Sequence, residues 1–300
     1  MNKVVVLMST YNGEKYLRTQ LDSILEQRNV NVEILVRDDG STDSTIEILK
    51  EYESKGLLKW YTGENLRPAK SFMNLVKNAP EAEYYAFSDQ DDYWLPEKLS
   101  RAIEGLCAID GVGPKLYYST TILVDKNLKK LNLNYKYIQS IDFNTAVVSS
   151  NATGCTMCFN KELLDIVNLY TPTYQMMHDG WIHKVCLAVS GKVYCDKEAY
   201  IYYRQHDNNV IGGKHSFSNR WKRRFGYLKN RTRVRSKGIH ELLNGYSEIM
   251  SEENRKICKK MINYRYDILD KINLIFSRNI HGADFFTDLM YRLAVVFNAF

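Results

Sequence analysis

Two clusters of acidic residues follow short apolar runs of the sequence. Asp38-Asp39-Gly40 comes directly after one predicted strand, and Asp89-Gln90-Asp91-Asp92 comes directly after another. Ligands of an open α/β sheet bind outside the carboxyl ends of its strands, so we expect both clusters and the Thr10-Tyr11-Asn12 turn to border one crevice. Four or five carboxylates there would repel each other, and an oxygen-preferring cation such as Mg²⁺ or Mn²⁺ would relieve this and bring phosphates. The alternative is that Asp-Asp-Gly-Ser only forms a turn and a helix cap, but two such clusters favour the metal–phosphate site.

The elements that would position these acids alternate between strands and helices. Four β-branched or aromatic runs are predicted strands: Val4–Met8, Val32–Val36, Leu57–Tyr61 and Tyr84–Phe87. Between the first two, helical periodicity predicts one apolar face: Leu17, Leu21, Ile24 and Leu25. We expect Asn12 to cap that helix, and Ser44-x-x-Glu47 to form a capping box at the start of the next one. This alternation predicts an α/β fold with a mostly parallel sheet and helices on both faces.

Length and composition exclude several classes of protein. The chain has 300 residues, of which 45% are apolar and 25% are charged, so a fully disordered chain is excluded. The length corresponds to two domains, or to one large α/β domain with an appendage. No run approaches the roughly 18 apolar residues of a transmembrane helix. Six scattered cysteines, and a first apolar run of strand length, predict a cytosolic protein with reduced thiols.

The net charge of +6 is unevenly distributed. Residues 214–240 contain ten Lys or Arg and no acid, so the rest of the chain is mildly acidic. Four aromatic residues stand among these cations: Phe217, Trp221, Phe225 and Tyr227. Such a segment binds nucleic acid, lies on an anionic membrane, or is a solvated helix face. Because the composition becomes helical and basic after Gly212-Gly213, we expect a boundary there.

The segment Cys155-Thr-Met-Cys158 has the spacing of a zinc or redox motif. No second cysteine pair at ligand spacing accompanies it. If the segment is a strand, residues i and i+3 point to opposite faces, so the two sulfurs would not share a metal. We therefore expect a structural role for both cysteines.

A series of motifs resembles the family 2 glycosyltransferases, which have the GT-A fold. In order along the chain they are Ser9-Thr10-Tyr11-Asn12-Gly13-Glu14, Asp38-Asp39-Gly40-Ser41-Thr42-Asp43, Ser88-Asp89-Gln90-Asp91-Asp92-x-Trp94-x-Pro96-x-Lys98-Leu99, Gly154-Cys155, His178-Asp179-Gly180-Trp181 and Tyr203-Arg204-Gln205-His206-x-x-Asn209-x-x-Gly212. The set is most similar to the bacterial rhamnosyltransferase branch. The resemblance implies a GT-A catalytic domain over residues 1–213, with a nucleotide-sugar half at about 1–110 and an acceptor half at about 111–213. A basic helical region, residues 214–300, would follow.

The resemblance also implies which residues bind the donor. Tyr11 would stack on the pyrimidine of a nucleotide sugar, Thr10 would contact it through the backbone, and Asp39 would accept the base N3–H. Further nucleotide contacts are expected from Glu14, Asp38, Lys70 and Asp89. Arg67-Pro68, just before Lys70, stands where a glycine is frequent in this branch.

The remaining implied roles concern the metal, the base and the acceptor. Asp91 would ligate a metal that bridges the diphosphate, supported by Asp89, and His206 would complete its sphere or hold a phosphate. The metal would act as a Lewis acid toward the departing nucleoside diphosphate. Asp179 would be the general base, and one base without a covalent partner gives inversion. Two residues would line the acceptor site or belong to the core: Trp94 and Trp181.

The implied function is an inverting, metal-dependent glycosyltransferase of the cytoplasm, peripheral at the inner face of the plasma membrane. Its donor would be dTDP-L-rhamnose, with a UDP-hexose as the nearest competitor, and its acceptor a growing capsule, O-antigen or cell-wall polysaccharide on a lipid diphosphate. Residues 214–240 would contact anionic membrane instead of nucleic acid, and Leu289–Phe300 would enter the interface or pack in a homodimer. The alternative of another class is a non-catalytic nucleotide-sugar or nucleic-acid binding protein; Asp179 argues against the first and the acidic body against the second.

Overall fold

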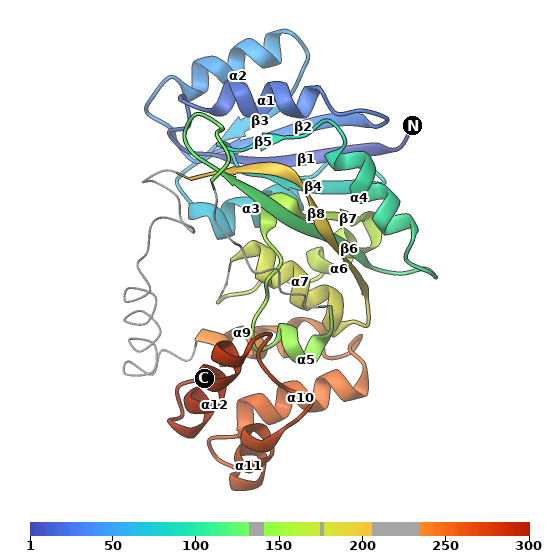
Figure 1. The fold of residues 1–300 in the computed structure, drawn as a ribbon, viewed down its shortest axis with the longest axis vertical. Coiled ribbons are helices and arrows are strands. Elements are labelled where there is room, and N and C mark those ends of the chain that lie inside the picture. The colour runs from blue at the N-terminus through green and yellow to red at the C-terminus, as the bar shows by residue number, and fades with distance from the viewer. Residues whose placement is uncertain (132–140, 175–176, 206–233) are drawn as a thin grey trace.

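The structure is a computed structural model that describes residues 1–131, 141–174, 177–205 and 234–300. Within these ranges the centre of the fold is an eight-stranded sheet with the order β3-β2-β1-β4-β7-β6-β8-β5 (Figure 1). The strands are β1 (Lys3–Thr10), β2 (Asn31–Asp38), β3 (Lys59–Thr62), β4 (Tyr84–Ser88), β5 (Tyr93–Trp94), β6 (Lys115–Val124), β7 (Cys158–Asn160) and β8 (Lys192–Arg204). Strands β3, β2, β1 and β4 are parallel, whereas β7 is antiparallel to both its neighbours. The predicted α/β fold and its first four strands are confirmed.

Helices cover both faces of this sheet (Figure 1). In order along the chain, the helices of the described residues are α1 (Leu17–Leu25), α2 (Thr45–Ser54), α3 (Arg67–Lys77), α4 (Lys98–Cys107), α5 (Phe143–Ala146), the 3₁₀ turn η1 (Gly154–Thr156), α6 (Lys161–Asn168), α7 (His178–Ala188), α9 (Val234–Tyr246), α10 (Glu252–Asn263), α11 (Ile268–Phe276) and α12 (Phe285–Val296). On β1, Val5 and Leu7 face the core that contains α3, α6 and α7. Val4, Val6 and Met8 face the other core, with α1, α2 and α4. Burial on both faces explains why β1 reads as an unbroken apolar run.

One of two predicted helix starts is wrong, and the other lacks its predicted capping hydrogen bond. Asn12 is not an N-cap, because α1 begins only at Leu17 and Asn12 has a positive φ of 48°. Its side chain instead accepts the backbone N–H of Thr42 (2.8 Å) and so ties the loop after β1 to the loop after β2. Ser44 is the N-cap residue of α2, as predicted, but its side chain makes no capping hydrogen bond, and Asp43 Oδ1 accepts the N–H of Thr45 at 3.1 Å. Leu25, predicted on the buried face of α1, is 36% exposed.

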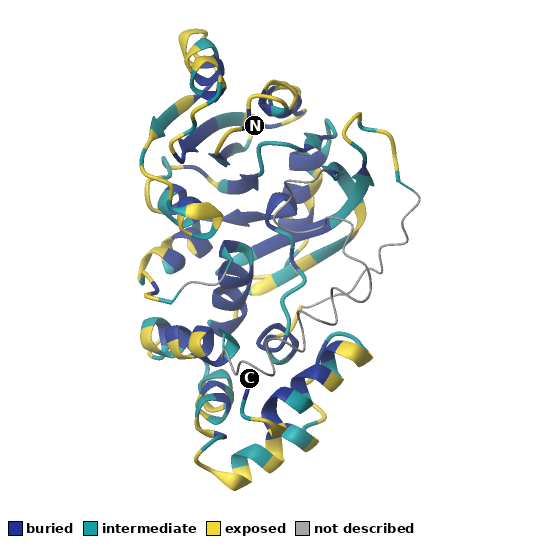
Figure 2. Ribbon diagram, turned by 90° about the vertical axis from the view of Figure 1, so that its left-hand side faces the viewer, coloured by how far each residue is buried: buried dark blue, intermediate teal, exposed yellow. Residues whose placement is uncertain are grey.

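The C-terminal helices continue one of the two cores. Helix α9 packs against α7 and α10, and its Ile239, Leu242 and Tyr246 share a hydrophobic cluster with Trp181. Figure 2 shows buried residues on the inner sides of these helices and exposed residues on their outer sides. The boundary predicted at Gly212-Gly213 lies outside the described residues. In the part of the chain that the structure describes, no helix has both the length and the apolar composition of a membrane span.

Candidate active site

The carboxyl ends of β1, β2 and β4 meet at one edge of the sheet, as the sequence predicts. Thr10 at the end of β1 is in register with Asp38 at the end of β2. The loop after β4 is joined to the loop after β1 by Gln90, whose Oε1 accepts the N–H of Tyr11 (2.9 Å) and whose Nε2 donates to the Tyr11 carbonyl (3.1 Å). A Cβ on Gly13 would lie 2.3 Å from Gln90 Oε1, so only glycine leaves room for this link.

Asp38 and Asp39 are both buried, and their carboxylates already have partners. Asp38 is 0% exposed and accepts the Thr10 hydroxyl (3.0 Å) and the N–H groups of Gly40 and Ser41 (3.0 and 2.8 Å). It therefore anchors the turn, which was the structural alternative considered for this cluster.

Asp39 is held from two sides. It forms an ion pair with Arg37, and these side chains are 3% and 4% exposed. Its Oδ2 accepts the N–H of Leu66 (3.0 Å), just before α3. The next residue, Arg67, has a φ of 63°, the left-handed conformation that favours glycine. The Asp39 carboxylate, which is predicted to accept the N3–H of a nucleobase, is therefore buried and already paired with Arg37.

The other residues that are predicted to contact the nucleotide differ in their exposure to solvent. Tyr11 is 49% exposed, so its ring is open to a stacking partner. Thr10 is buried, and its carbonyl accepts the N–H of Asp39 at 2.8 Å. Glu14 is exposed, but its Oε2 accepts the N–H of Ser44 (2.9 Å). Lys70 is exposed in the first turn of α3.

The acids after β4 form a tight cluster with one cysteine. Ligand atoms of Asp89, Asp92 and Cys155 all lie within 4.8 Å of one another. Burial, followed by the charges of Asp91 and Asp179, raises the pKa of Asp89 to about 7. Burial, followed by Asp91 and Asp89, also raises the pKa of Asp92 well above its ordinary value. Both pKa values are raised because several negative charges lie close together at a buried position with little solvent.

This cluster fits a divalent cation. Carboxylate oxygens are the ligands that Mg²⁺ and Mn²⁺ prefer, and a cation would offset both the burial of these carboxylates and their mutual repulsion, which together raise both pKa values. Asp92 Oδ1 accepts the N–H of Arg204 (3.1 Å), whereas its buried Oδ2 has no hydrogen-bond partner among the described residues. The sequence placed Asp92 in this acidic cluster without assigning it as a metal ligand, and it gave Cys155 a structural role. Cys155 lies in η1, whereas Cys158 begins β7 and stays outside the cluster.

Asp179 lies at the N-terminus of α7, within electrostatic reach of this cluster. It is half-buried, its Oδ1 accepts the N–H of Gly180 (2.6 Å), and its Oδ2 accepts the N–H of Gly154 (3.3 Å). The preceding His178 is a packing residue, because its ring stacks on Phe72 with centroids 3.9 Å apart. Burial lowers the pKa of His178 to about 4, so the imidazole is neutral.

Arg204, at the end of β8, holds the acidic loop in position and was not singled out from the sequence. Its Nε donates to the Asp91 carbonyl (2.7 Å), and its Nη1 donates to the Lys126 carbonyl (2.6 Å). Its guanidinium also lies 4.3 Å from the ring centroid of Tyr16. The motif around it was visible in the sequence, but His206, the predicted metal ligand two residues later, lies outside the described residues.

The acceptor-binding role of Trp94 and Trp181 is not supported. Both side chains are 1% exposed. Lys98 Nζ lies 3.6 Å from the ring centroid of Trp94, and Trp181 packs near Tyr246 with centroids 6.0 Å apart. A ring enclosed in this way has no face to offer to a saccharide, so both belong to the core, the alternative that the sequence left open.

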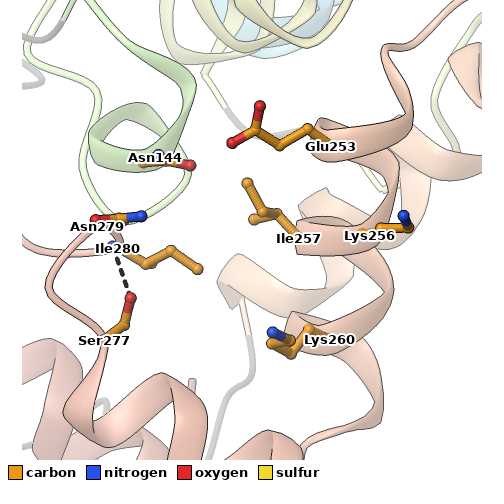
Figure 3. Close-up of a pocket in the computed structure, with 8 residues that line it drawn as sticks. All are labelled: Asn144, Glu253, Lys256, Ile257, Lys260, Ser277, Asn279 and Ile280. Carbon is orange, nitrogen blue, oxygen red and sulfur yellow. Dashed lines mark hydrogen bonds between the residues drawn. The ribbon is translucent and has the colours of Figure 1, made fainter.

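A pocket of about 240 Å³ lies far along the molecule from this edge, in the C-terminal region (Figure 3). Residues of α5, of α10 and of the loop after α11 line it: Asn144, Glu253, Lys256, Ile257, Lys260, Ser277, Asn279 and Ile280. None of the predicted site residues belongs to this lining. The acidic edge of the sheet therefore remains the candidate active site.

Comparison with known proteins identifies similar sequences. The family described as Glycosyl transferase family 2 matches residues 5–166. The dTDP-rhamnosyl transferase RfbG of Shigella flexneri is 30% identical over 240 residues, which are 75% of this chain and 80% of that protein. The UDP-Glc:alpha-D-GlcNAc-diphosphoundecaprenol beta-1,3-glucosyltransferase WfgD of Escherichia coli is 33% identical over 161 residues, which are 53% of this chain and 54% of that protein.

Solved structures share the fold. S. aureus TarS 1–349, in complex with UDP-GlcNAc, matches with a TM-score of 0.58 at 19% identity, covering 98% of this chain and 90% of that one. GalNAc-T7 with UDP, GalNAc and Mn²⁺ matches with a TM-score of 0.60 at 13% identity, covering 91% of this chain and 57% of that one. The predicted GT-A fold is confirmed.

Proposed function

The chain belongs to glycosyl transferase family 2 and is a glycosyltransferase, and from this premise we propose that it transfers L-rhamnose from dTDP-L-rhamnose, with inversion and with a divalent cation, to a hydroxyl of a growing surface polysaccharide. One observation carries the proposal: Asp179 and the loop of Asp89, Asp91 and Asp92 border one edge of the sheet, close enough for their charges to interact. A base and a phosphate-binding cation within reach of one substrate are what a single displacement requires.

The donor proposal rests on Tyr11 and on the relatives. The half-exposed ring of Tyr11 stands beside the acidic edge and can stack on a pyrimidine. The name of RfbG specifies a dTDP-rhamnosyl transferase, which supports dTDP-L-rhamnose. The name of WfgD and the UDP-GlcNAc complex of TarS favour the second candidate, a UDP-hexose donor.

The residues after β4 are the proposed holders of the cation. Asp91 and Asp89 would ligate it, and ligand atoms of Asp92 and Cys155 lie within 4.8 Å of Asp89. When bound, Mg²⁺ or Mn²⁺ would neutralise charge on the departing nucleoside diphosphate. Arg204 keeps this loop in place through the Asp91 carbonyl.

Asp179 is the proposed general base. Its carboxylate takes the proton of the acceptor hydroxyl while that oxygen attacks the anomeric carbon of the donor, and the bond from this carbon to the diphosphate breaks. The new bond forms opposite the leaving group, so the configuration inverts. The N–H groups of Gly154 and Gly180 orient the carboxylate, and the start of α7 favours its negative charge.

The proposed acceptor is linked to a lipid diphosphate, and the proposed place of action is the inner face of the plasma membrane. Residues 214–240 would attract anionic lipid through their ten Lys and Arg. We propose residues 1–213 as the catalytic domain and residues 214–300 as the region that brings it to its acceptor. The name of WfgD, which specifies a diphosphoundecaprenol-linked acceptor, supports this assignment.

The experiment is nucleoside diphosphate release from a panel of dTDP- and UDP-sugars, with Mg²⁺, Mn²⁺ or a chelator and without acceptor. We expect slow release from dTDP-L-rhamnose that requires the cation. Asp91→Asn should abolish the effect of the cation, whereas the matched variant Asp110→Asn, an exposed carboxylate on the body, should behave as the wild type.

Each outcome of this panel is informative. Release from a UDP-hexose alone would replace the proposed donor by the second candidate. Release that is unchanged by the chelator, or by Asp91→Asn, would contradict the cation site. No release and no thermal stabilisation with any nucleotide sugar would contradict the proposed donor chemistry altogether.

A further inference from the structure

Helix α11 leaves an apolar face uncovered at the end of the molecule opposite α2 (Figure 1). Ile268, Ile272 and Phe276 recur at intervals of four residues and are 68%, 46% and 75% exposed. Side chains at this spacing lie on one face of a helix. Leu274 is 0% exposed and holds the helix to the protein. The apolar face of α11 therefore points away from the core.

Helix α12, which packs against α11, has a second such face. Phe285, Leu289 and Val296 are 75%, 39% and 42% exposed, and their spacing places them along one side of the helix. Tyr291 on another side is fully buried. Isolated exposed apolar residues are normal on a protein surface, but two neighbouring helices that each expose an apolar face are not.

Lys256 and Lys260 of α10, which packs against α11, lie beside the loop that follows α11, whereas several acids nearby accept hydrogen bonds or pair with a cation. Asp267 and Asp284 cap α11 and α12, by accepting N–H groups of Leu269 (2.8 Å) and Thr287 (3.0 Å). Asp288 pairs with Arg292 on the same helix (2.8 Å). Of the acids that remain, Asp270 lies in the first turn of α11 and Glu253 lines the pocket of Figure 3, together with the cations of α10.

The strongly basic segment of the sequence leads into the same region. Its last two cations, Arg235 and Lys237, lie in the first turns of α9. Ser236 Oγ between them donates to the carbonyl of Phe300 (2.8 Å), and the Arg235 guanidinium lies 5.9 Å from the Phe300 ring. Phe300 follows α12 by a few residues, so the end of the basic segment is fixed beside α12.

We propose that the apolar faces of α11 and α12 lie on an anionic lipid bilayer, with the surrounding cations over the lipid headgroups. This inference rests on the proposed membrane-linked acceptor and names the surface that makes the contact. Helices of nine and twelve residues are too short to cross a bilayer, which takes about 20 residues, so they lie in its interface.

The test is flotation of the full chain with phosphatidylcholine vesicles, with and without phosphatidylglycerol, at low and high salt. The wild type should float only with the anionic vesicles, and salt should weaken binding in part. I272S/F276S/F285S should lower the partition coefficient at least about tenfold, because each side chain loses its burial in lipid. The matched control V112S/L169S removes two side chains that are 101% and 67% exposed on the catalytic body, and it should bind as the wild type.

Four outcomes would overturn the inference. The wild type does not bind the vesicles, the triple variant binds them as the wild type does, or the control variant loses as much binding as the triple variant. In the fourth, the only change in the triple variant is a smaller mass in analytical ultracentrifugation. That last result would assign the faces to a second copy. Nucleoside diphosphate release, measured on the same samples, should be equal in all variants, which shows that they are folded. Failure of release with intact vesicle binding would contradict the proposed function and leave this surface standing.

Discussion

The buried ion pair of Arg37 and Asp39 gives the sharpest prediction for stability. Arg37→Met removes the guanidinium and leaves a carboxylate that is 3% exposed without its counter-charge. It also removes the hydrogen bonds to Ser71 Oγ (3.2 Å) and to the Glu64 carbonyl (3.0 Å). Breaking a buried pair from one side costs about 3–5 kcal/mol, so we expect a loss of this size in the free energy of unfolding from urea denaturation.

The matched control is Lys59→Met. Lys59 pairs with Glu33 (3.0 Å) but is 74% exposed, and such surface pairs contribute about 1 kcal/mol or less. The double variant Arg37→Met/Asp39→Asn should recover much of the loss, because the buried charge is then gone. A single Arg37→Met variant that loses no more stability than Lys59→Met would refute this reasoning.

Three further predictions concern binding and pH. Tyr11→Ala should weaken nucleotide affinity by about 1–3 kcal/mol, the value of one base–aromatic stack; unchanged affinity in calorimetry would remove Tyr11 from the site. Gly13→Ala should displace the Gln90 amide from the Tyr11 backbone and so lower nucleotide affinity. Because Gly13→Ala and Gln90→Ala would remove the same hydrogen bonds, the double variant should lose little more affinity than either single variant in a double-mutant cycle. His178 has a pKa of about 4 in the folded protein, below its ordinary value of 6.5. Protonation of His178 therefore favours the unfolded chain. The free energy of unfolding should fall by about 3 kcal/mol as the pH drops from about 6.5 to 4. His178→Phe should flatten this part of the curve, and an equally steep curve would contradict the assignment.

The sequence predicted the fold where one local signal was sufficient. Strand β1 is buried on both faces, so its apolar run identified it, and the acids after β2 and β4 met at one edge because parallel strands end together. Helix starts were predicted less well. Asn12 has the residue type of a cap but bonds a loop 30 residues away, and Ser44 occupies the N-cap position of α2 without the predicted side-chain hydrogen bond.

Features that depend on distant parts of the chain were not predicted. Arg37, which pairs with Asp39, is held in place by Ser71 and the Glu64 carbonyl, which are far from it in the sequence. Cys155 lies beside the acids that follow β4, more than 60 residues earlier in the sequence, and its segment forms a 3₁₀ turn. The burial of Trp94 and Trp181 likewise depends on packing between elements that are far apart in the sequence. Residue types therefore identified the chemistry of the site, whereas tertiary packing decided which atoms are available for it.

The most direct test of the central claim compares Asp179→Asn with the wild type in two measurements on one sample. With the donor and the cation present, calorimetry measures binding and a coupled assay measures release of the nucleoside diphosphate. A missing general base should slow release by about 100-fold or more, while donor affinity stays unchanged, because the carboxamide keeps the shape of the side chain. Release at the wild-type rate would show that Asp179 is not the base and would contradict the proposed mechanism.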